Sequence, residues 1–200
     1  HVGDIGRMVN EFSAFARMPE PVMQSFDLIA EVRETLALQR EAHTDIAFGF
    51  KGLLAERAPL IVTADPQQIR QAFTNLVQNA IDSIRGRIKE GDNTAPGQIH
   101  ILLTPNVPEM GFFSLAVVDN GRGLPKGVAP TELMEPYVTH REKGTGLGLA
   151  IVKKIMEDHG GRVAMGGDTG LAGNPDWTDL GGATIALVLP MPKDDNQKAA

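Results

Sequence analysis

Hydrophobic residues recur at spacings of three and four in four stretches of the chain, a period that is typical of amphipathic helices. This pattern predicts helices over residues 2–18, 26–40, 66–87 and 148–158. Asp27 is a candidate N-cap of the second helix. Asp65 and Pro66 mark the start of the third, because an acidic cap and a proline at the first helical position both favour helix initiation. Pro19 and Pro21 end the first helix.

Six shorter apolar stretches, bounded by turn residues, have the pattern of strands. They cover residues 45–52, 59–65, 98–104, 111–120, 161–167 and 183–190. Residues 121–144 lack a regular pattern and are expected to form a mobile cover. We expect the strands to pair in antiparallel fashion and the helices to form a separate layer. The predicted fold class is therefore α+β, a two-layer sandwich.

Length and composition limit what the chain can be. With 200 residues, of which 42% are hydrophobic and 22% charged, it is expected to form one main domain. We divide it into a first helix (1–18), a linker (19–25), the main domain (26–192) and a disordered tail (193–200). The chain does not begin with Met, which indicates a piece of a longer protein.

Charge and residue usage argue against several classes of function. A net charge of -6 favours no polyanionic partner, so we expect no nucleic-acid binding. The chain has no cysteine, which excludes disulfides, thiolate metal sites and thiol nucleophiles. No apolar run approaches the roughly 20 residues that span a bilayer, so we expect no membrane contact by these residues.

The polar side of the predicted third helix carries a row of amides. Gln71, Asn75 and Asn79 lie four residues apart, with Asp82 close by, so they share one side of the helix. An amide oxygen can join the coordination shell of Mg2+ without adding charge, while the metal takes its other ligands from phosphates and water. Taken alone, such a row is usually a solvated helix face.

The motif "DNGRGLP" places Asp119 at the end of a strand, followed by Gly121 and Gly123. A carboxylate there can accept a hydrogen bond from the 6-amino group of adenine, whereas guanine presents an acceptor at that edge and would be repelled. The glycines let a flat base approach the backbone. Taken alone, this motif is usually a turn.

The stretch "HREKGTGLGLAIVKK" has glycines at three alternate positions and runs directly into a predicted helix. The free N–H groups and positive dipole end of that helix favour an anion such as phosphate. Arg141 and Lys143, just ahead of the glycines, can neutralise phosphate charge. Taken alone, the loop is as well explained by a surface turn that caps the helix. The ordered occurrence of all three motifs points instead to a nucleotide site.

With these motifs the chain resembles the catalytic and ATP-binding domain of sensor histidine kinases, in the superfamily that includes gyrase-type ATPases, heat-shock-90 chaperones and MutL. "QAFTNLVQNAIDS" is similar to the N box, and "DNGRGLP" and "GTGLGLAIVKKIMEDHGG" to the two glycine boxes. "MEPYVTH" resembles the F box with Tyr137 in place of Phe, and "GGAT" the last glycine motif. "IGRMVNEFSAFARMPEP" resembles the end of the second dimerisation helix in kinases of the NtrY and NtrB type.

The resemblance implies a Bergerat fold, a mixed sheet backed by helices, with ATP and Mg2+ bound beneath a lid at residues 123–143. By position, Asn79 would bind the metal, Asn75 and Gln71 would support the phosphates, and Asp119 would hold adenine. The implied catalytic residues are Asn75, Asn79, Arg141 and Lys143. The implied nucleotide-binding residues are Gln71, Asn75, Asn79, Asp82, Asp119, Gly121, Gly123, Tyr137, Thr139, Gly144, Thr145, Gly146, Leu147, Gly148 and Thr184.

The resemblance also implies partners that these residues do not supply. None of the five histidines has the sequence context of a phosphate acceptor, so the acceptor is expected upstream, on a dimerisation domain of a homodimeric parent. A response regulator would receive the phosphoryl group, and the location would be cytoplasmic, in a parent that is soluble or an inner-membrane sensor. Two alternatives stay open: an ATP-hydrolysing conformational switch and a non-catalytic nucleotide-sensing module.

Overall fold

The computed structural model describes residues 13, 18–56, 59–92, 95–138 and 146–192. Apart from Ser13 and Met18, the predicted first helix lies outside these residues, as does the predicted tail at 193–200. Met18 is partly buried and packs against the main core. Among the described residues, no helix is both long and apolar enough to cross a membrane.

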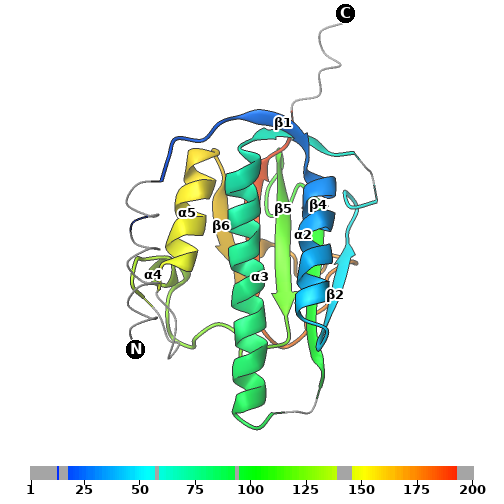
Figure 1. Ribbon diagram of the computed structural model, residues 1–200, viewed down its shortest axis with the longest axis vertical. Helices are drawn as coiled ribbons and strands as arrows, with labels where there is room; N and C mark the ends of the chain where they lie inside the picture. Colours follow the sequence, from blue (N-terminus) through cyan, green and yellow to red (C-terminus); the bar gives the residue numbers. More distant parts are fainter. Residues whose placement is uncertain (1–12, 14–17, 57–58, 93–94, 139–145, 193–200) are drawn as a thin grey trace, which may run out of the picture.

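A sheet of five strands forms one layer of the molecule (Figure 1). In spatial order the strands are β2 (Ile46–Lys51), β4 (Gly97–Pro105), β5 (Phe112–Asp119), β7 (Thr184–Pro190) and β6 (Arg162–Met165). The predicted strand at 161–167 is shorter than expected, because its last residues belong to the 3-10 turn η1 (Gly166–Thr169).

The expectation of purely antiparallel pairing is wrong at one edge of this sheet. β2 pairs with β4 in parallel, with Ile46 opposite Gly97, whereas the other three pairings are antiparallel. Parallel neighbours need a long crossover connection, and here the crossover contains a whole helix. The sheet is therefore mixed, as the family resemblance implies.

Three helices cover one face of the sheet: α2 (Leu28–Ala42), α3 (Pro66–Lys89) and α5 (Gly148–Asp158) (Figure 1). The predicted apolar stripe of α3 is buried at every position: Ile69, Ala72, Phe73, Leu76, Val77, Ala80, Ile81 and Ile84. It packs with the inward residues of the sheet, such as Ile101, Leu115 and Leu187, in one continuous core. The α+β two-layer prediction is confirmed.

A separate two-stranded sheet corrects the predicted linker and second helix. β1 (Gln24–Asp27) pairs antiparallel with β3 (Ile61–Ala64), so the end of the predicted linker is a strand, and α2 begins at Leu28 rather than Phe26. Asp27 is the N-cap, as predicted, because its Oδ1 accepts from the backbone N–H of Ile29. The same oxygen accepts from the N–H of Leu60 (3.0 Å), which ties the entrance of β3 to the helix.

The outer face of the sheet has a small core of its own. Leu102, Ala116 and Val188 are buried there, with Trp177 and Leu180 packed over them. The loop that connects η1 to β7 supplies both covering side chains. In the expected irregular segment after β5, residues 130–133 form the short helix α4 (Pro130–Leu133).

Candidate nucleotide-binding site

The start of α3 is fixed by Asp65, which is buried. Its Oδ1 accepts from the N–H groups of Gln67 (2.9 Å) and Gln68 (3.1 Å), which would otherwise lack partners in the first turn. Its Oδ2 accepts from the N–H of Val22 (2.8 Å), which anchors the incoming chain. Burial acts to raise the pKa of Asp65, but these donors outweigh it and hold the pKa below its ordinary value.

His159 has a structural role. It is buried at the end of α5, and its Nε2 accepts from the N–H of Asp65 (3.0 Å). Because Nε2 acts as the acceptor, the proton lies on Nδ1, which donates to the carbonyl of Ile155 (2.7 Å). This histidine joins the end of α5 to the start of α3, and the two helices therefore run in opposite directions.

The amide row lies beside the start of α5. The side chain of Gln71 is exposed, whereas those of Asn75 and Asn79 are half-buried. Asn75 Nδ2 donates to the carbonyl oxygen of Gly148 (3.4 Å), the first residue of α5. The structure thus brings the amide row and the second glycine motif together, 73 positions apart in sequence.

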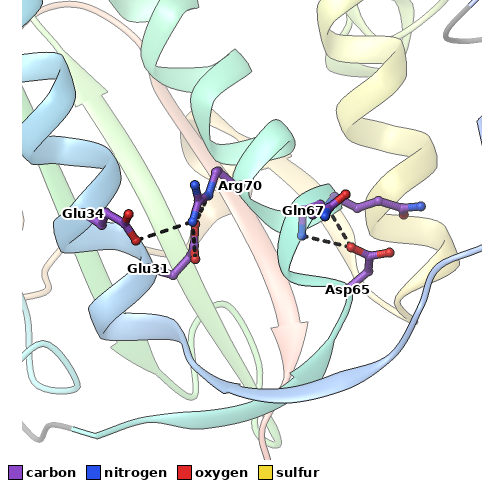
Figure 2. Close-up of polar contacts among 6 residues, drawn as sticks. Glu31, Glu34, Asp65, Gln67 and Arg70 are labelled. Atoms are coloured by element: carbon purple, nitrogen blue, oxygen red, sulfur yellow. Dashed lines mark hydrogen bonds and ion pairs between the residues drawn. The ribbon is translucent and has the colours of Figure 1, made fainter.

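An open groove runs along the first half of α3 and reaches the amide row. Its lining residues are Pro66, Gln67, Arg70, Gln71, Thr74 and Asn75. Arg70 forms ion pairs with Glu31 and Glu34 of α2, and Figure 2 shows it between the two carboxylates. Its hydrogen bond and charge interaction with Glu31 raise the pKa of Arg70. The guanidinium is thereby held at the α2 side of the groove.

Asp119 ends β5 and is only 3% exposed. Its Oδ1 accepts from the N–H of Gly121 (2.7 Å) and from that of Ala183 (3.4 Å). Its own N–H donates to the carbonyl of Ala183 (2.9 Å), so the carboxylate is fixed against the start of β7. A buried carboxylate held this way is an acceptor of defined direction.

The loop after Asp119 packs closely against α3. A Cβ at Gly121 would be 2.2 Å from Ser83 Oγ and 2.6 Å from its carbonyl carbon, so only glycine fits there. Gly123 has a φ of 80°, a conformation that favours glycine. Both predicted glycines are thus needed for the shape of the loop.

Gly146, a predicted phosphate contact, lies directly against the backbone of Tyr137. A Cβ there would be 2.6 Å from the carbonyl carbon of Tyr137, and its carbonyl accepts from the N–H of Tyr137 (3.0 Å). Tyr137 itself has a φ of 67°, which is rare for a bulky residue, and its side chain is 56% exposed. Gly146 therefore joins two segments in a close backbone contact.

The remaining predicted residues fall into three groups. Leu147 and Thr184 are buried, and α5 begins at Gly148, with no capping hydrogen bond from the side chain of its N-cap residue Leu147. Asp82 is exposed and accepts from Gln78 Nε2 (2.9 Å), turned along the helix surface. Thr139, Arg141, Lys143, Gly144 and Thr145 lie outside the described residues. Within the described part of the chain, no group of three or more His, Asp or Glu side chains could hold a metal.

Sequence reasoning missed four residues that shape the site. Gly182 lies against Asp119, and Ser83, Gly86 and Arg122 join the glycine loop to α3. Of the four, only Gly86 could have been singled out from the sequence, because an isolated glycine within a strong helical pattern usually has a packing reason. For the other three, the sequence carried no signal beyond the motifs themselves.

The fold and the site define a class: a two-layer sandwich of helices on a mixed sheet, with a row of amides on one helix in contact with the start of another and a buried carboxylate at the end of a strand. The sequence profile of the histidine kinase-, DNA gyrase B-, and HSP90-like ATPases matches residues 64–193. The chain belongs to this family of ATP-binding domains.

Two named relatives are similar to most of this chain. The chain is 42% identical over 165 residues to the nitrogen regulation protein NtrY of Azorhizobium caulinodans, covering 82% of this chain and 20% of that protein. It is 29% identical over 168 residues to the sensory histidine kinase/phosphatase NtrB of Rhodobacter capsulatus, covering 80% of this chain and 45% of that protein. The chain therefore spans about a fifth of the length of the NtrY protein it matches.

Solved histidine kinase structures share the fold. The catalytic domain of histidine kinase ThkA matches with a TM-score of 0.64 and 28% identity, covering 85% of this chain and 96% of that one. ThkA in complex with the response regulator protein TrrA matches with a TM-score of 0.67 over 96% of this chain and 49% of that one. The identity to the latter, 23%, supports the fold alone.

Proposed function

We propose that this chain is the ATP-binding catalytic domain of a sensor histidine kinase, which transfers the γ-phosphoryl group of ATP to a histidine on a dimerisation domain. The observation that carries the proposal is the contact between Asn75 and Gly148, which joins the amide row of α3 to the second glycine motif. The buried carboxylate of Asp119 lies at the end of the sheet that these helices cover.

Adenine recognition is assigned to Asp119. Backbone N–H groups of Gly121 and Ala183 hold its Oδ1, so the carboxylate presents a fixed acceptor toward a base. A fixed acceptor selects the 6-amino group of adenine against the oxygen of guanine. Gly121, Gly123 and Thr184 line the same end of the sheet and complete this half of the site.

The phosphate half of the site is assigned to α3 and α5. Asn79 would coordinate Mg2+, which takes its other ligands from phosphates and water; this fits a site without a carboxylate cluster among the described residues. Asn75 and Gln71 would support the phosphates, with Asp82 and Tyr137 at the edges. The N-terminus of α5, from Leu147 and Gly148, favours anions. The residues proposed to complete this half are Thr139, Arg141, Lys143, Gly144, Thr145 and Gly146.

ATP supplies the phosphoryl group when it is bound, and the protein supplies position and charge neutralisation. The amides hold the phosphates and the metal without accepting a proton. A water-activating ATPase needs a base at this place, and the Asn75 amide cannot act as one. Kinase chemistry is therefore favoured over the ATP-hydrolysing switch.

The acceptor histidine is proposed to reach the site along the groove of α3. The chain enters the domain beside this groove: Val22 donates to Asp65, and Gln68 Nε2 donates to the carbonyl of Pro19 (3.0 Å). A preceding dimerisation helix would thus be delivered next to the groove. The parent is proposed to be a homodimer that passes the phosphoryl group to a response regulator receiver domain.

The test is phosphoryl transfer in trans. The protein is incubated with γ-labelled Mg-ATP and a separate dimerisation fragment that supplies the acceptor histidine. We expect label on that fragment that is stable to base and lost in acid, and no label when Mg2+ is removed by a chelator. Free phosphate without labelled protein would instead support the ATPase switch, and nucleotide binding without either product would support the sensing module.

A matched pair of variants tests the metal assignment. Asn79→Ala is expected to abolish transfer while leaving the circular dichroism and thermal unfolding unchanged, because Asn79 lies on the polar side of α3. Gln39→Ala, which removes an amide of α2 away from the site, is the control and is expected to retain full transfer. Full transfer by Asn79→Ala would contradict the assignment.

A further inference from the structure

Arg122, between the two glycines of "DNGRG", reaches back across α3. Its backbone N–H donates to Ser83 Oγ (3.0 Å). Its Nη2 donates to the carbonyl of Gly86 (3.2 Å) and pairs with Glu90 Oε1 (2.7 Å). One residue of the loop thus contacts two turns of the helix.

Gly86 provides the space for this guanidinium. A Cβ at position 86 would be 2.6 Å from both Cζ and Nε of Arg122. The φ of Gly86 is not positive, so the backbone conformation does not require glycine. Glycine inside a helix is unfavourable relative to alanine. The structure therefore explains glycine at position 86 by the space that the Arg122 side chain occupies.

The interaction also suits the end of a helix. The carbonyl of Gly86 lies near the C-terminal end of α3, where the helix dipole favours a cation, and it already accepts from the backbone N–H of Glu90 (3.1 Å). Arg122 supplies a second donor and a positive charge from a different segment. The contact consequently fixes the loop relative to α3 rather than only filling a surface.

We propose that Arg122 is a positioning residue for nucleotide binding: its side chain, seated on Gly86 and paired with Glu90, holds the loop that begins at Asp119 in register with α3. The inference rests on the proposed function, because it assigns adenine to that loop and the phosphates to α3. A nucleotide that bridges the two elements binds well only when their separation is fixed.

The decisive variant is Gly86→Ala. The new Cβ displaces the far end of a flexible side chain, which is a small steric cost, and replaces a helix-interior glycine. We expect Tm to rise by about 2–4 °C, as for a gain of helix propensity in a domain of this size. We expect ATP affinity, measured by calorimetry, to fall about three- to ten-fold, since a partly exposed charge-assisted contact is lost. A purely structural role would move Tm and affinity in the same direction.

Three further variants complete the cycle. Arg122→Ala is expected to weaken ATP binding to a similar degree, and Gly86→Ala added to Arg122→Ala to weaken it no further, because the guanidinium is already absent. Arg85→Ala removes an exposed arginine of the same helix that contacts His43 Nδ1 (3.0 Å), and this variant is expected to bind ATP as wild type does. Unchanged ATP affinity in Gly86→Ala or Arg122→Ala would overturn the proposal.

A readout without nucleotide separates this inference from the proposed function. In the free protein, hydrogen exchange at the N–H of Arg122, which donates to Ser83, is expected to accelerate in both Gly86→Ala and Arg122→Ala. Unchanged exchange in both variants would overturn the positioning role. Failure of the wild-type protein to bind ATP would refute the proposed function and leave this exchange test standing.

Discussion

Replacing Gly182 with alanine tests whether the position of Asp119 governs ATP binding. A Cβ at this position would be 2.3 Å from the carbonyl oxygen of Asp119, 2.5 Å from its Oδ1 and 2.6 Å from the nitrogen of Gly121. All three atoms belong to one buried turn. Because φ at Gly182 is not positive, alanine causes no backbone strain, and its effect comes from the steric clash of its Cβ.

The size of the effect follows from these distances. Real Cβ atoms essentially never approach other heavy atoms closer than 3.0 Å, so the Asp119 carbonyl must move by about 0.7 Å. Overpacking of this kind costs typically about 1–3 kcal/mol of stability. A shift of that size also spoils a hydrogen bond to a charged group, worth about 1.5–3 kcal/mol. The expected loss of ATP affinity is therefore about 10- to 100-fold, since a factor of ten corresponds to about 1.4 kcal/mol.

Calorimetric titration with Mg-ATP measures the affinity, and denaturant unfolding measures the stability. Gly167→Ala is the matched control, because a Cβ there would meet no atom within 4 Å and φ is again not positive. Asp119→Ala serves as the reference for complete loss of the carboxylate. If Gly182→Ala bound ATP as tightly as Gly167→Ala, the assignment of adenine to Asp119 would be wrong.

Two further predictions concern pH and stability. Asp65→Ala removes the N-cap of α3 and the acceptor for Val22, and we expect a loss of about 2–4 kcal/mol in urea unfolding at pH 7. Because the pKa of Asp65 is lowered in the folded protein, the carboxylate contributes to the free energy of unfolding at pH values above the ordinary pKa of 3.8, and this contribution disappears as the pH falls through the folded pKa. If the free energy of unfolding fell with acid pH as steeply in Asp65→Ala as in wild type, this reasoning would be wrong. Burial and the charge of Lys51 lower the pKa of His100 in the fold, so the unfolded chain binds a proton first and stability falls as the pH drops below about 6.5. In His100→Gln the free energy of unfolding is expected to fall less between pH 7 and 5.5 than in wild type, and an equal fall in both proteins would refute this prediction.

The sequence was most informative where one physical rule decides the structure. The apolar stripe of α3 and the Asp65–Pro66 start predicted that helix to within two residues at its end, because burial and capping act locally. The range predicted for α5 matches the observed helix. β1 was missed because its four residues are a strand only through pairing with β3, a contact that the local pattern does not contain.

The candidate site divides in the same way. The motifs identified residues that lie together, such as Asn75 and Gly148, because the order of motifs carries the family resemblance. Gly182 and Arg122 stand inside two of these motifs but received no role, because the contacts that matter for them join distant segments. Asp82 was included for its nearness along the helix; in the structure it is exposed and accepts from Gln78 Nε2, and its place in the site stays a prediction.

Two glycines that sequence reasoning did not assign to the site separate stability from binding. Gly86 and Gly182 both have a φ that other residues adopt, and both leave too little space for a Cβ. At Gly86 the obstructing atoms are the end of the Arg122 side chain, which can move aside, whereas at Gly182 they are backbone and a buried carboxylate, which cannot. The same alanine substitution should therefore raise Tm at position 86 and lower it at position 182, while ATP affinity falls at both. The two substitutions thus change Tm in opposite directions but lower ATP affinity in both cases. A fall in affinity at both positions therefore cannot be a by-product of unfolding.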